Sequence, residues 1–113
     1  MSLTEKQISE KLRNLGISAN LYGFTYIKEA LTLLSEDETL LKRLTTTQGL
    51  YRTIARKYNT ISSRVERDIR HAKERALTYG DITELKTIGV YKEARMKNGE
   101  FLGAIYECMK YEE

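Results

Sequence analysis

The sequence predicts an all-α protein, a compact bundle of about six helices. Three observations lead to this prediction. First, the chain contains no proline and 31% charged residues, a composition that suits long helices with one solvated face. Second, apolar residues recur at helical spacing along most of the chain, and no long stretch alternates between apolar and polar residues as a strand does. Third, 113 residues with 41% hydrophobic content are enough for one compact domain, residues 1–113, and too few for two.

The N-terminal part of the chain predicts two helices. The first is expected to run from Thr4, which can cap it, to about Leu15, with Gly16 as its C-terminal cap residue. The second is expected from Gly23 to about Ser35. Their inward-facing side chains are predicted to be Ile8, Leu12, Leu15, Tyr26, Ile27, Ala30, Leu33 and Leu34. The acidic run 36–38 either lies near the end of the second helix or starts a short helix through Leu44, and both readings stay open.

The middle of the chain predicts two helices that are separated by a tight break at residues 58–60. The inward residues of the first are predicted to be Leu50, Ile54, Ala55 and Tyr58. At about 100° per residue, one apolar stripe on the second consists of Ile61, Val65, Ile69, Ala72 and Ala76. Gly80 is expected to end this helix as a left-handed cap. Two helices joined in this way are the sequence form of a helix-turn-helix, whose second helix lies in the DNA major groove.

The C-terminal part of the chain predicts two further helices. Asp81 can cap a short helix from Ile82 to about Ile88. Residues 90–97 fit a loop or an irregular turn. Asn98 can cap a final helix from Glu100 to about Tyr111. The inward residues of this last helix are predicted to be Phe101, Leu102, Ile105 and Met109.

Positive charge is concentrated on the predicted helix-turn-helix. The whole chain carries a net charge of only +3, but the segment from Arg52 to Arg75 has eight basic and three acidic residues, an excess of +5. The basic residues are Arg52, Arg56, Lys57, Arg64, Arg67, Arg70, Lys73 and Arg75. A localised basic stripe on a nearly neutral protein is the pattern expected for a polyanion site. A solvated helix face with no ligand is the alternative reading of the same charges.

The first turns of the second helix carry residue types that read DNA bases. Arginine can bridge two acceptors of guanine, glutamate can accept from the cytosine amino group, and serine can serve either base. The candidates for base contacts are Ser63, Arg64, Glu66 and Arg67. Glu66 also has a purely structural reading, because it has capping-box spacing from Ser63 and can pair with Arg70 one turn later.

Further candidates are better placed for the phosphate backbone than for base edges. Arg70 and His71 lie further along the same helix, whereas Arg56 and Lys57 lie at the end of the preceding helix. His71 is the only histidine, and without nearby cysteines or paired carboxylates it makes a weak metal or catalytic ligand.

Several classes of function lack support in the sequence. There is no glycine-rich phosphate loop, no paired-cysteine metal site and no triad-like set of residues, so no enzyme activity, cofactor or metal is expected. No apolar run is long enough to cross a membrane, and no basic start followed by an apolar stretch suggests a signal peptide. The single cysteine, Cys108, is expected to pack and cannot form an internal disulfide, which favours a reducing, cytoplasmic location.

The chain resembles a known family in three blocks of sequence. The most specific block lies in the second helix of the predicted motif and includes residues 59–60, 63–67 and 69–72. The other blocks are residues 15–17 with 23–30, and residues 50–51 with 54–58. In these blocks the sequence is similar to the C-terminal DNA-binding effector domain of stage-zero sporulation protein A, the response-regulator transcription factor of endospore-forming bacteria.

The resemblance implies a six-helix domain that binds short promoter elements, often in tandem, as an activator or a repressor. It implies base and phosphate contacts at Ser63, Arg64, Glu66, Arg67, Arg70 and His71. It also implies that the segment after the recognition helix, here residues 80–93, contacts an RNA polymerase sigma factor. This segment matches the family poorly. The sequence contains no receiver domain, so the chain is either an excised effector domain or a stand-alone regulator.

Two hypotheses from different classes follow. The leading one is a transcription regulator that binds double-stranded DNA sequence-specifically. The alternative is a helical protein-interaction module that retains the fold without DNA binding. Because no heptad stripe is present, we expect a monomer or a weak dimer that pairs on adjacent DNA sites. The candidate pairing surface is the segment 80–93 with the final helix, around Tyr106 and Tyr111.

Overall fold

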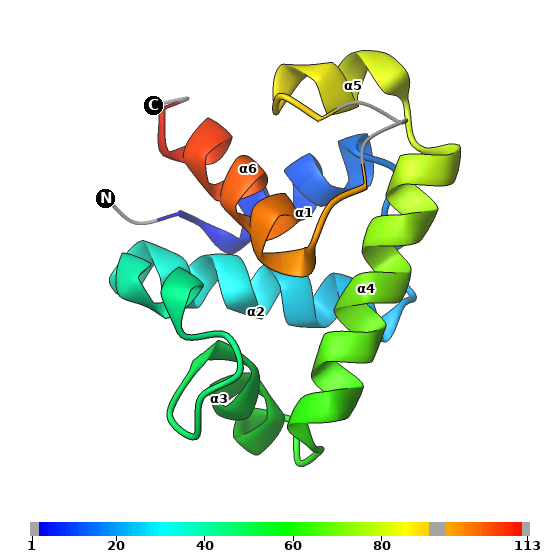
Figure 1. Cartoon of the computed structure of the whole chain (residues 1–113). Helices are drawn as coiled ribbons and strands as arrows, with labels where there is room; N and C mark the ends of the chain where they lie inside the picture. Colours follow the sequence, from blue (N-terminus) through cyan, green and yellow to red (C-terminus); the bar gives the residue numbers. More distant parts are fainter. Residues whose placement is uncertain (1–2, 91–94, 112–113) are drawn as a thin grey trace.

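The computed structural model of the protein describes residues 3–90 and 95–111, and this part of the chain forms six α-helices and one 3₁₀ helix, with no strand (Figure 1). The elements in chain order are α1 (Glu5–Asn14), α2 (Tyr22–Glu36), η1 (Glu38–Lys42), α3 (Leu50–Lys57), α4 (Ser62–Tyr79), α5 (Ile82–Thr87) and α6 (Asn98–Lys110). The predicted all-α class is therefore confirmed.

The start of α1 follows the predicted cap. The Thr4 hydroxyl accepts a hydrogen bond from the Gln7 main-chain N–H at 3.2 Å, and the Thr4 N–H donates to Gln7 Oε1 at 2.9 Å. This reciprocal capping box satisfies two donors that the first turn would otherwise leave open. At the other end Gly16 has a φ of +91°, which side chains with a Cβ rarely adopt, so the predicted cap glycine reverses the chain towards α2.

The acidic run 36–38 serves both of the functions that the sequence left open. Glu36 is the last residue of α2, and Asp37 caps η1 by accepting a hydrogen bond from the Thr39 N–H at 3.0 Å. The new helix is a short 3₁₀ helix that ends at Lys42, two residues before the predicted Leu44.

Helix α2 lies at the centre of the molecule and contacts α1, η1, α3, α4 and α6 (Figure 1). Its fully buried side chains include Ile27, Leu31 and Leu34, which join one continuous hydrophobic core. Leu33, which was predicted to face inward, is half-buried and packs against the edge of this core, whereas the fully buried Leu31 was not predicted.

A close backbone contact fixes α2 against α4. A Cβ atom at Gly23 would lie 2.3 Å from the Asp68 main-chain oxygen and 2.6 Å from the Ala72 Cβ. Only glycine leaves room for this approach, so the first turn of α2 rests directly on the backbone of α4. The contact determines where α4 lies relative to the rest of the core.

Two predicted helix caps were wrong. Gly80 ends α4 with φ −70° and ψ 163°, outside the left-handed region. Glycine is needed there for space, since a Cβ atom would lie 2.4 Å from the Leu15 main-chain oxygen. Asn98 does not cap α6 but is its first residue, and Lys97 is the cap, with its N–H donating to Glu100 Oε1 at 2.9 Å. Asn98 is unable to cap because its side chain is directed at α4 instead.

Candidate nucleic-acid interface

Helices α3 and α4 are joined by a four-residue turn, residues 58–61. The Thr60 N–H donates to the Ala55 oxygen at 2.9 Å and closes the end of α3. Asn59 has a φ of 55°, a left-handed conformation that asparagine tolerates better than most residues. The break that the sequence predicted at residues 58–60 is confirmed. In Figure 1 this turn lies at one tip of the molecule, and α4 runs from it along one side.

The apolar stripe of α4 is buried as predicted, except at its first position. Val65, Ile69, Ala72 and Ala76 are all buried against the core. Ile61 is 55% exposed, because it precedes the helix with extended backbone angles of φ −118° and ψ 154°, so helical spacing does not govern its direction. The prediction that Tyr58 is buried was also wrong, since this residue lies in the turn and is 37% exposed.

With the stripe inward, α4 presents a polar face to solvent. Ser63, Arg64, Arg67 and His71 are exposed, whereas Glu66 and Arg70 are half-buried. The side chain of Arg64 makes no hydrogen bond or ion pair with the described residues, 3–90 and 95–111. The structure therefore places all six candidates of this helix along one connected face, opposite the core.

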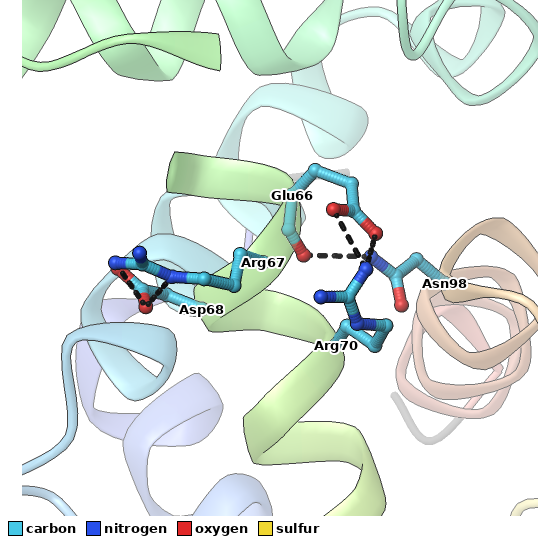
Figure 2. Close-up of polar contacts among 5 residues, drawn as sticks. All are labelled: Glu66, Arg67, Asp68, Arg70 and Asn98. Atoms are coloured by element: carbon cyan, nitrogen blue, oxygen red, sulfur yellow. Dashed lines mark hydrogen bonds and ion pairs between the residues drawn. The ribbon is translucent and has the colours of Figure 1, made fainter. Parts of the chain in front are cut away.

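Two ion pairs within α4 hold Arg67 and Arg70 (Figure 2). Arg70 Nη1 donates to both carboxylate oxygens of Glu66, at 3.0 and 3.1 Å. Arg67 donates from Nε and Nη2 to Asp68 Oδ1, at 3.3 Å each. The structural pairing of Glu66 with Arg70 is thus realised, but the capping box with Ser63 is not, because Ile61 is the cap residue and makes no side-chain bond.

Asp68 is a partner of a candidate site residue that the sequence did not predict. Adjacent residues on a helix do not face each other, so spacing rules favour pairs three or four positions apart. Arg67 nevertheless folds back onto its neighbour, whose carboxylate is mostly covered at 17% exposure. No pattern in the sequence would have signalled this pair.

The end of α3 supplies one unpaired cation and one paired cation. Arg56 is exposed and makes no hydrogen bond or ion pair within the described ranges. Lys57 Nζ donates to Glu29 Oε1 of α2 at 2.7 Å, and the Tyr58 hydroxyl donates to the same oxygen at 3.1 Å. The hydrogen bond that Lys57 donates to Glu29 raises the pKa of Lys57. Lys57 would therefore have to share its charge with Glu29, or leave it, in order to contact another anion.

One of the eight basic residues of the segment from Arg52 to Arg75 is not at the surface. Lys73 is only 7% exposed, and its ammonium group donates to the Met96 main-chain oxygen. It ties the chain just before α6 to the recognition-helix candidate and adds little to the surface charge.

Asn98 forms a second tie between α4 and α6. This residue is 8% exposed, and its Nδ2 donates to the Glu66 main-chain oxygen at 3.1 Å (Figure 2). No pattern in the sequence indicates this role, since asparagine before a helix is normally read as a cap. Figure 2 shows that Asn98 and the Glu66–Arg70 pair lie on one flank of α4, whereas Arg67 and Asp68 lie on the other.

The structure contains few features of other kinds of site. Within residues 3–90 and 95–111, no cluster of histidine, cysteine, aspartate and glutamate could hold a metal ion. Cys108 is half-buried and packs against the core. None of the described helices combines the length and the apolarity that crossing a bilayer requires.

One comparison with known proteins bears on this arrangement. The family described as "Sporulation initiation factor Spo0A C terminal" matches residues 8–109, which is nearly the whole chain. The match includes α3, α4 and the turn between them, and it extends to α2 and most of α6.

Proposed function

We propose that this chain, which belongs to the family of the C-terminal domain of sporulation initiation factor Spo0A, regulates transcription by binding double-stranded DNA sequence-specifically. This is a family of DNA-binding effector domains of sporulation regulators and not of enzymes. In the proposal α3 and α4 form a helix-turn-helix, and α4 enters the major groove. The observation that carries the proposal is the outer face of α4, where Arg64, Arg67 and Arg70 have no acidic partner from any other described element.

The proposal divides the candidate residues by their position on the helix. Ser63, Arg64, Glu66 and Arg67 lie in the first turns of α4, where base edges are reached. Arg70 and His71 follow, and Arg56 and Lys57 lie at the end of α3, so these four are proposed to contact phosphates. For Lys57 the phosphate would replace the Glu29 carboxylate as the partner of the ammonium group.

The alternative, an interaction module without DNA binding, predicts a different surface. A helix that has lost its DNA site would be expected to cover its arginines with acidic groups from neighbouring elements. Here the carboxylates that hold Arg67 and Arg70 belong to α4 itself, and both arginine side chains stay accessible to solvent. This observation favours the DNA-binding proposal.

The proposal also covers the domain organisation, the location and a protein partner of the chain. Residues 1–113 are proposed to form one domain that acts in the cytoplasm on promoter DNA. The proposed contact with an RNA polymerase sigma factor falls on residues 80–93, which include α5. Residues 91–93 of that segment lie outside the described residues.

Replacing Arg64 or Arg67 with alanine is expected to weaken binding to a preferred duplex by about 1–3 kcal/mol and to relax the preference at one base pair. The physical reason is the loss of a bidentate contact to a base edge. Preferred duplexes can be obtained by in vitro selection, and affinities can be measured by gel shift at several salt concentrations. Arg13→Ala on α1, an exposed arginine on another helix, is the matched control. Equal losses on preferred and scrambled DNA would assign the arginine to phosphate contact instead.

The free protein is expected to be a monomer or a weak dimer, and two copies are expected to bind adjacent sites cooperatively. Neighbouring sites raise the effective concentration of two copies, so a weak contact suffices for cooperativity. Sedimentation of the free protein measures its assembly state, and titration of one-site and two-site duplexes measures cooperativity. A tight dimer without DNA, or equal affinity per site on both duplexes, would contradict this expectation.

A further inference from the structure

A hollow lies beside α4 on the flank that carries Glu66 and Arg70. Its volume is about 390 Å³, and it lies between α4, the start of α3 and the chain at the start of α6. The polar and charged residues that line it include Thr45, Glu66, Arg70, Lys73, Lys97 and Asn98. Two of these residues, Arg70 and Lys97, are accessible cations and one is a carboxylate, so the hollow has an excess of positive charge even without the buried Lys73. Helix α4, the proposed recognition helix, forms one wall of the hollow, and residues outside the helix-turn-helix, at 44–45 and 96–99, form the opposite wall.

The wall of this hollow is anchored to α4 by two buried side chains. Lys73 donates to the Met96 oxygen, and Asn98 donates to the Glu66 oxygen at 3.1 Å. These bonds bind the residues on both sides of Lys97 to two successive turns of α4. The main chain of Lys97 is therefore held in place relative to the recognition helix, although the residue belongs to a distant part of the sequence.

The ammonium group of Lys97 has no partner within the described part of the chain. Lys97 is exposed, and its hydrogen bonds are made by its main chain, whose N–H donates to Glu100 and whose oxygen accepts from the Phe101 N–H. Arg70, on the opposite side of the hollow, already shares its charge with Glu66. The main chain of Lys97 is thus held in place, whereas its ammonium group is unpaired among the described residues.

The dimensions of DNA place a strand next to this cation. An α-helix with its side chains is about 10–12 Å wide, and the major groove is about 12 Å wide, so a recognition helix fills the groove. Groups on the flank of the helix then face the sugar-phosphate backbone that borders the groove. The hollow beside Glu66 and Arg70 is such a flank.

We propose that Lys97, placed by Asn98, is a phosphate contact outside the helix-turn-helix, and that the hollow receives the backbone of one strand bordering the major groove. The proposal rests on the DNA binding proposed above and extends it to the start of α6. Thr45 lines the same hollow and is exposed, so its hydroxyl supplies a further donor to the same backbone. In this arrangement α6 contributes to affinity for every DNA sequence and not to base preference.

The first test compares Lys97→Ala with the wild type on a selected duplex and on a scrambled duplex of equal length. Losing one phosphate contact should reduce the slope of log K against log salt by about 0.9 on both duplexes. Between about 50 and 200 mM salt, the variant should therefore lose roughly threefold less affinity than the wild type. Lys6→Ala on α1 removes the same charge from an exposed residue on another helix and should leave the slope unchanged. A wild-type slope for Lys97→Ala would overturn the proposal.

The second test asks whether Asn98 positions Lys97. In a double-mutant cycle, Lys97→Ala should have a smaller effect on affinity when Asn98 is already alanine. Thermal melting of each variant confirms that the comparison is made between folded proteins. Strictly additive effects would remove Asn98 from the proposal. If Arg67→Ala weakens binding and Lys97→Ala does not, the proposal that Lys97 contacts a phosphate is wrong, and the proposed function stands. If the wild type binds no duplex at all, the proposed function itself fails.

Discussion

Replacing Val65 or Ile69 with aspartate is expected to unfold the protein and not merely to weaken DNA binding. Both side chains are fully buried in the stripe of α4 that faces the core. A carboxylate there would lose its hydration without gaining a partner, and mutations of this kind cost at least about 4–5 kcal/mol. Such a loss is comparable with the whole stability of a small protein, about 5–15 kcal/mol. Helical circular dichroism and thermal melting measure the outcome.

The matched control for these variants is Ser63→Asp on the same helix. Ser63 is exposed, and an acidic residue in the first turn of a helix interacts favourably with its N-terminus. The control should therefore melt like the wild type, even where its DNA affinity falls. If Val65→Asp or Ile69→Asp also keeps the melting temperature of the wild type, α4 is rotated relative to the orientation described above.

Gly23→Ala is expected to destabilise the protein by about 2–3 kcal/mol, although alanine is the better helix former. The new methyl group would collide with the main-chain oxygen of Asp68, which a side-chain rotation cannot move away. Helices α2 and α4 would have to separate, and the core between them would lose contacts. Denaturant unfolding gives the free energy, and a loss of this size should lower the melting temperature by roughly 10 °C.

Gly103→Ala on α6 provides the comparison for Gly23→Ala. A Cβ atom at Gly103 would lie 3.1 Å from Leu41 Cδ2, the end of a flexible side chain that can shift. The gain in helix propensity, up to about 1 kcal/mol, should then appear as unchanged or increased stability. Equal effects of the two substitutions would show that the contact between α2 and α4 tolerates a methyl group.

The parts of the fold that local rules control could be predicted from the sequence. The Thr4 cap, the reversal at Gly16 and the break after α3 each depend on a few neighbouring residues. The parts that failed depend on contacts between distant segments. Gly80 looked like a left-handed cap, but it is glycine because Leu15 passes close to it. Asn98 looked like a cap as well, but its amide is used on α4, which no local pattern can reveal.

The candidate site could be predicted as a face of one helix but not as a set of pairings. Helical spacing correctly separated Arg64 and Arg67 from the buried stripe. It could not show that Lys73, at the edge of that stripe, donates to Met96, since the partner lies 23 positions later in the chain. It also could not show the partner of Lys57, since Glu29 lies 28 positions earlier in the chain.

The ion pairs on α4 have a further consequence for the entropy of recognition. Immobilising one long side chain at an interface costs about 0.5–1.5 kcal/mol of conformational freedom. Arg67 and Arg70 are already restrained by Asp68 and Glu66 in the free protein, so part of this loss precedes the encounter with DNA. Arg64 has no such restraint and keeps its rotamers until a partner arrives. One face of α4 therefore combines a preorganised portion, suited to a fixed geometry, with an adaptable portion that can adjust to sequence variation.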